Sequence, residues 1–181
     1  MRRRLAGLLP LLLLGACAGP AARSVTALPE RPGDAVTDPA HQAVFRAAYA
    51  FGDTSRLAGR PADAARAVAD VEWLAVALPQ DQRWIGASPL LFGRLEAARA
   101  ELRGVLGIAP DAAPSAVTQR LFSAAAALDQ GRRAEAAAAL GGEDRLALLG
   151  ALPPLPRTAF ATHSAQAELG RLMSDDPQNG E

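Results

Sequence analysis

The sequence predicts an all-α fold, a small bundle of about five to seven helices arranged as antiparallel hairpins. Alanine and leucine, which are among the strongest helix formers, supply 43 and 26 of the 181 residues. Eight aromatic residues and few β-branched residues leave little material for a β-sheet. Glycine and proline together number 30, below the share that is typical of low-complexity chains. We therefore expect most of the chain to fold, with helix packed closely on helix.

The first element is a predicted secretory signal peptide over residues 1–16. Three arginines follow Met1, an apolar run extends from Leu5 to Leu14, and small residues come next. The apolar run is about ten residues long, whereas a membrane-spanning helix needs about 20. The segment is therefore expected to direct export and then to be removed.

Leu14, Gly15, Ala16 and Cys17 end this segment with an aliphatic residue, two small residues and a cysteine. The pattern resembles the lipobox of bacterial lipoproteins. This resemblance implies that Cys17 becomes the lipidated first residue and anchors the chain in a membrane. Because Ala18 and not aspartate follows, it also implies the periplasmic face of the outer membrane as the location. The alternative is an ordinary secreted protein in which Cys17 is incidental.

Residues 17–37 are predicted to form a flexible tether, and residues 174–181 a disordered polar tail. The tether contains Pro20, Pro29 and Pro32 and shows no helical periodicity. Once residues 1–16 are removed, 16 arginines face 19 acidic residues, a formal charge of −3. This mildly acidic balance and the lack of a basic patch with interleaved aromatics argue against nucleic acid as a partner.

Residues 38–173 are predicted to form one helical domain. Asp38-Pro39 and Ser88-Pro89 pair a capping side chain with proline at the first helical position, and Pro61 opens another helix. Apolar residues then recur at helical spacing. We expect helices over residues 39–58, 61–78, 89 to about 107, 115–129, 132–140, 143–149 and 158–173.

Two stretches of the domain share a pattern of small residues around a Gly-Arg turn. The matching positions are Gly52, Gly59, Arg60, Ala64 and Val68 in one stretch and Ala124, Gly131, Arg132, Ala136 and Leu140 in the other. Both resemble the tetratricopeptide repeat, which implies a short array of stacked hairpins. A plain antiparallel bundle is the alternative.

No residue is predicted to be catalytic or to bind a metal or a cofactor. His41 and His163 stand apart from each other and from paired carboxylates at ligand spacing. Asp70 and Glu72 lie near Trp73, but we expect them on a solvated helix face. Gly-x-Ser-x-Gly is absent. An enzyme is therefore the least favoured class of function.

Arg83, Trp84 and Ile85 form the candidate partner contact, because tryptophan and arginine are enriched at binding hot spots. Trp84 is expected either to plug the end of the bundle or to be an exposed anchor.

We therefore expect a membrane-anchored periplasmic lipoprotein that acts as a helical adaptor for envelope proteins. A carrier of an apolar or lipid ligand is the alternative, and an envelope enzyme is third. An adaptor requires an exposed contact surface, a carrier an apolar cavity, and an enzyme a polar cleft with perturbed pKa values. The sequence leaves the partner, the ligand and the oligomeric state open.

Overall fold

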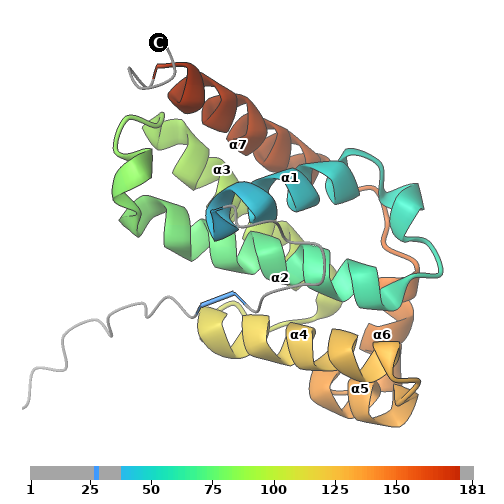
Figure 1. Ribbon diagram of the computed structural model, residues 1–181. Helices are drawn as coiled ribbons and strands as arrows, with labels where there is room; N and C mark the ends of the chain where they lie inside the picture. The colour runs from blue at the N-terminus through green and yellow to red at the C-terminus, as the bar shows by residue number, and fades with distance from the viewer. Residues whose placement is uncertain (1–26, 29–37, 176–181) are drawn as a thin grey trace, which may run out of the picture.

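The structure is a computed structural model that describes residues 27–28 and 38–175. These residues form seven α-helices and three short 3-10 helices and contain no β-strand, so the predicted all-α fold is confirmed (Figure 1). The α-helices are α1 (Pro39–Gly52), α2 (Pro61–Ala77), α3 (Pro89–Leu106), α4 (Pro114–Asp129), α5 (Arg133–Leu140), α6 (Glu143–Gly150) and α7 (Pro156–Ser174). The 3-10 helices are η1 (Thr54–Leu57), η2 (Leu78–Gln80) and η3 (Gln82–Trp84).

Helix α2 is the central element of the bundle. It packs most extensively against α4 and also against α1, α3 and α6 (Figure 1). Twelve of its seventeen residues are buried, and six of these are alanines, whose small side chains allow close approach of neighbouring helices. An element covered on several sides can keep a charged residue only if that charge is paired.

Helix α7 closes the other side of the bundle by packing against α1 and α3. Ala161, Ala165 and Leu169 form its buried stripe at helical spacing. Thr158 begins this stripe, and its backbone N–H donates to Glu101 Oε2 on α3 at 2.8 Å. Helix α7 thus contacts segments that lie far from it in the sequence. Whether the hairpins form a tetratricopeptide-like repeat stays a prediction.

Prolines define the predicted helix starts. Pro39, Pro61 and Pro89 each occupy the beginning of a helix, as expected. The Asp38 carboxylate caps α1 by accepting from the backbone N–H of Ala40 at 2.8 Å. At the other end of α3, Gly107 adopts a left-handed conformation with φ of 61° and ends the helix.

The expectation that the first helix reaches residue 58 is wrong. Helix α1 ends at Gly52, and the extended residue Asp53 caps η1 by accepting from the backbone N–H of Ser55 at 3.0 Å. A side-chain carboxylate that holds a local turn competes with continuation of the helix. The early end places η1 between α1 and α2, where it forms one wall of a cleft.

No helix within residues 38–175 is long and apolar enough to span a membrane.

Candidate functional site

The lipobox residues Leu14, Gly15, Ala16 and Cys17 lie outside the described residues, so lipidation at Cys17 stays a prediction. The other candidate residues, Arg83, Trp84 and Ile85, lie between α2 and α3 at the end of the bundle. Trp84 is only 1% exposed and Ile85 is 81% exposed. Arg83 pairs with Asp38 and with Asp81, the latter at 2.6 Å. Trp84 therefore plugs the bundle end, and its ring offers no surface to a partner in this structure.

The expectation that Asp70 and Glu72 lie on a solvated face is wrong, because both side chains are fully buried. Helix α2 is covered by α1, α3, α4 and α6, so both side chains lie beneath neighbouring helices. Each carboxylate instead pairs with an arginine from an adjacent helix. This pairing offsets part of the large cost of removing a charge from water.

The Glu72 carboxylate accepts two hydrogen bonds from Arg103 on α3, from Nε at 2.7 Å and from Nη2 at 2.8 Å. Arg103 Nη1 also donates to the backbone carbonyl oxygens of Ala109, Pro110 and Ala112, at 3.3, 2.8 and 3.0 Å. The hydrogen bonds to Glu72 raise the pKa of Arg103 above its ordinary value. The pair thus fixes the loop between α3 and α4.

The Asp70 carboxylate accepts from Arg46 on α1, from Nε at 3.1 Å and from Nη2 at 3.3 Å. The carboxylate is fully buried, whereas the arginine side chain is 23% exposed. Arg46 therefore reaches from the protein interior to the surface.

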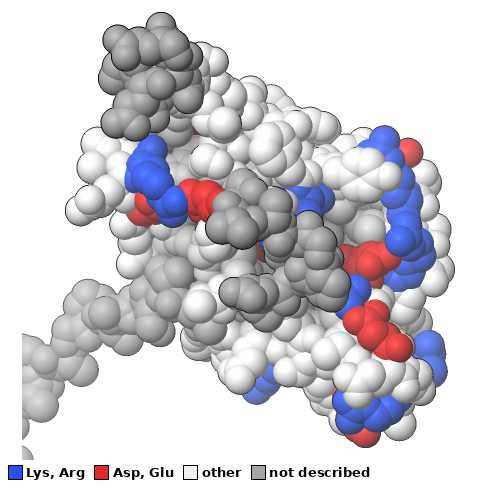
Figure 2. All heavy atoms as spheres, viewed as in Figure 1, with Lys and Arg blue, Asp and Glu red and all other residues white. Residues whose placement is uncertain are grey.

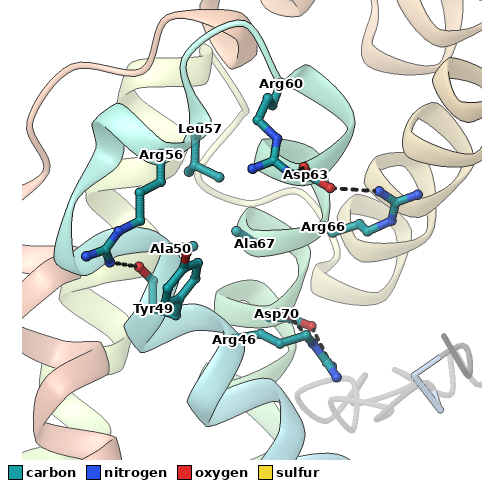
Figure 3. A pocket seen from close by; sticks show the side chains of 10 residues that line it. All are labelled: Arg46, Tyr49, Ala50, Arg56, Leu57, Arg60, Asp63, Arg66, Ala67 and Asp70. Atoms are coloured by element: carbon teal, nitrogen blue, oxygen red, sulfur yellow. Dashed lines mark hydrogen bonds and ion pairs between the residues drawn. The ribbon is translucent and has the colours of Figure 1, made fainter. Parts of the chain in front are cut away.

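Arg46 borders a cleft between α1, η1 and the first half of α2, with a volume of about 200 Å³ (Figure 3). Charged side chains of both signs gather along the right edge of the view in Figure 2, on an otherwise mostly uncharged face. The cleft is lined by Arg46, Tyr49, Ala50, Arg56, Leu57, Arg60, Asp63, Arg66, Ala67 and Asp70. Four guanidinium groups face two carboxylates, so the lining carries an excess of two positive charges.

Tyr49 and Arg56 form one rim of the cleft. The Arg56 guanidinium lies over the Tyr49 ring, 4.5 Å from its centroid, and Nη1 donates to the Tyr49 carbonyl oxygen at 2.6 Å (Figure 3). Tyr49 is 67% exposed. An exposed aromatic ring held by a cation is a preorganised contact surface.

The opposite rim is an ion-pair chain on α2. Asp63 lies between Arg60 and Arg66, with nitrogen–oxygen distances of 2.7 and 3.2 Å, and Arg66 also pairs with Asp129 on α4. Arg60 is the most exposed of these arginines, at 64%. Both carboxylates of the cleft thus pair with arginine, which disfavours general acid–base chemistry. The excess of arginines suits the cleft to binding an anion.

Sequence reasoning missed this cleft, although part of its signal is visible in the sequence. Arg60, Asp63 and Arg66 recur at intervals of three residues, which places them on one helix face. The juxtaposition with Tyr49 depends on η1, whose position follows from the unexpected end of α1. Within residues 38–175, no cluster of three or more metal-ligating side chains occurs.

Comparison of the chain with protein-family models, curated proteins and solved structures finds no match.

Proposed function

We propose that the protein is a periplasmic lipoprotein, anchored in the outer membrane through Cys17, whose helical domain is an adaptor for an envelope protein. The observation that carries the adaptor role is the arginine-lined cleft with Tyr49 exposed at its rim. Tyrosine and arginine, together with tryptophan, are enriched at the hot spots of protein interfaces. The cleft takes over the contact role for which Trp84 is too deeply buried.

The charge of the cleft specifies the partner's chemistry. An excess of two positive charges in the lining favours an acidic segment, and arginine pairs with carboxylates in a bidentate geometry. Arg56 and Arg60 are the principal contacts for the acidic segment. Arg56 donates to a backbone carbonyl oxygen, which is neutral and leaves the charge of its guanidinium available, and the Arg60 side chain is mostly exposed. The partner segment therefore carries Asp or Glu next to an apolar side chain that packs on Tyr49.

Site-specific photocrosslinking in the full-length, membrane-bound protein tests this function. A photoreactive residue replaces Ala58, which is exposed between Arg56 and Arg60, or Ala134, an exposed control position on α5. We expect one protein adduct from position 58 and none from position 134. The double change Arg56→Glu and Arg60→Glu is expected to abolish the adduct.

The matched control reverses two exposed arginines elsewhere, Arg132→Glu and Arg133→Glu, and is expected to leave the adduct unchanged. Equal adducts from both positions, or equal loss in both double variants, would contradict the adaptor site. Intact mass measurement of the native protein and of Cys17→Ser tests the anchor separately. We expect acyl mass on the native protein only.

A further inference from the structure

A second pocket lies at the ends of α3 and α5, between α4, α6 and the loop after α3. Its volume is about 200 Å³, and it shares no lining residue with the arginine-lined cleft. Its walls are mostly aliphatic, with Leu106, Ile108, Val117, Leu121, Leu140 and Leu149 among them. Among the residues that the structure describes, Arg120 and Arg145 are its charged lining residues, and no acidic residue lines it.

The two arginines have no carboxylate partner among the described residues. Arg145 donates from Nη1 to the Leu140 carbonyl oxygen and from Nη2 to the Gly107 carbonyl oxygen, both at 2.8 Å. A guanidinium has five N–H donors, so three remain after these two bonds. Arg120 is exposed and makes no hydrogen bond or ion pair with the described residues. The pocket therefore combines an apolar interior with two cations that no acidic side chain within residues 38–175 neutralises.

The pocket is also held in shape. Arg103 binds the carbonyl oxygens of Ala109 and Ala112, two residues of the pocket wall, and is itself fixed by the buried Glu72. Arg145 ties the ends of α3 and α5 together through the two carbonyl oxygens. A preformed wall lowers the ordering cost that a ligand must meet.

We propose that this pocket binds a single-chain carboxylate amphiphile of medium length, such as a fatty acid of about eight carbons. The aliphatic walls take the chain, and Arg120 and Arg145 take the carboxylate, whose planar shape matches the guanidinium fork. An apolar cavity of about 150 Å³ accommodates benzene. A pocket of about 200 Å³ therefore fits one short chain and excludes a two-chain lipid.

This inference does not depend on the adaptor function, because the pocket and the cleft lie on different elements. The pocket is the kind of site that a carrier requires. A carboxylate amphiphile is the ligand class that the sequence left open. Failure at one site leaves the other unaffected, so the two proposals are tested separately.

Photolabelling of the full-length protein with an octanoate analogue that carries a diazirine in its chain tests the proposal. We expect label on peptides within residues 106–149. Octanoate is expected to displace the probe at concentrations about tenfold lower than 1-octanol, because only octanoate gains charge-assisted hydrogen bonds. Octylammonium is expected not to compete. Label spread evenly over the chain, or equal competition by octanol, would overturn the proposal.

Two variants and a control complete the test. Arg120→Gln removes an exposed cation without burying a polar group and is expected to weaken octanoate competition about tenfold. Ala139→Phe fills the pocket from its partly buried wall and is expected to abolish labelling. Arg157→Gln alters an exposed arginine on α7, outside the pocket, and is expected to change nothing. Unchanged labelling in Ala139→Phe would place the ligand elsewhere and reject the pocket.

Discussion

Glu72 and Asp70 lie two residues apart on the same buried helix, and the arginines that pair with them differ in exposure. Arg103, the partner of Glu72, is 4% exposed, whereas Arg46, the partner of Asp70, is 23% exposed. Arg103 also donates from Nη1 to three backbone carbonyl oxygens, and Arg46 borders an open cleft. Helix α2 thus supports both an internal brace, the Glu72–Arg103 pair, and the wall of an open cleft, where Asp70 pairs with Arg46.

The largest expected effect comes from removing one partner of the internal brace. Glu72→Ala leaves the Arg103 guanidinium buried without its carboxylate, which costs about 3–5 kcal/mol of unfolding free energy. Chemical denaturation measures this loss. The control Glu143→Ala removes an exposed pair with Arg133 and is expected to cost less than about 1 kcal/mol. Equal losses in the two variants would show that burial does not set the strength of these pairs.

Replacing both partners of the brace separates charge from packing. The double variant Glu72→Leu with Arg103→Met is expected to lose less stability than Glu72→Ala, because no unpaired charge stays buried. The carbonyl oxygens of Ala109, Pro110 and Ala112 then lack their donor. We expect faster amide hydrogen exchange over residues 108–113, measured by mass spectrometry. Unchanged exchange there would mean that Arg103 does not hold the loop.

Removing the arginine of the cleft-side pair is expected to cost less. Arg46→Gln leaves Asp70 buried, but a glutamine amide can still donate to the carboxylate and the cleft admits water. We expect a loss of about 1–3 kcal/mol in chemical denaturation. A loss larger than that of Glu72→Ala would reverse the comparison.

At the rim of the cleft, we expect a smaller effect on stability. Arg56→Gln removes an exposed contact with the Tyr49 ring, worth about 0.5–1 kcal/mol. The same change is expected to weaken the photocrosslink from position 58, because the cleft loses a cation that pairs with no carboxylate of the described residues. A strong loss of stability with an unchanged crosslink would make Arg56 a structural residue.

The smallest effect concerns a third carboxylate, Glu168 on α7, which lies outside the core. Hydrogen bonds from Arg171 and then from the Ser88 backbone N–H lower its pKa below the ordinary value of 4.5. Its stabilising contribution is therefore complete above about pH 4.5 and is lost as the pH falls through the lowered pKa. Glu168→Gln is expected to make the melting temperature depend slightly less on pH over this acidic range. An identical pH profile in both proteins would contradict this.

Much of the helix pattern could be predicted from the sequence. Pro39, Pro61 and Pro89 begin helices as expected, and apolar residues that recur at helical spacing in α2, Val68 among them, are buried. These features depend on near neighbours along the chain, and local rules govern them. The end of α1 could not be predicted in this way, because Asp53 has a local alternative to helix that the apolar periodicity does not reveal.

The candidate cleft was largely beyond sequence reasoning. Asp70 read as solvated because carboxylates usually are, and its pairing with Arg46 joins positions 24 residues apart. The sequence allows two roles for Trp84, and only packing decides that its ring is buried. Such outcomes depend on how many neighbours cover a helix face, a quantity that no short window of sequence contains.

By itself, the sequence determined an all-α chain with helix starts at Pro39, Pro61 and Pro89 and a core rich in alanine and leucine. These properties follow from propensity, capping and hydrophobic periodicity. The tertiary structure decided that α2 is central, that two of its carboxylates are buried, and that Tyr49 and four arginines share one cleft. The physical reason is that burial and charge pairing arise only when helices far apart in the sequence come together.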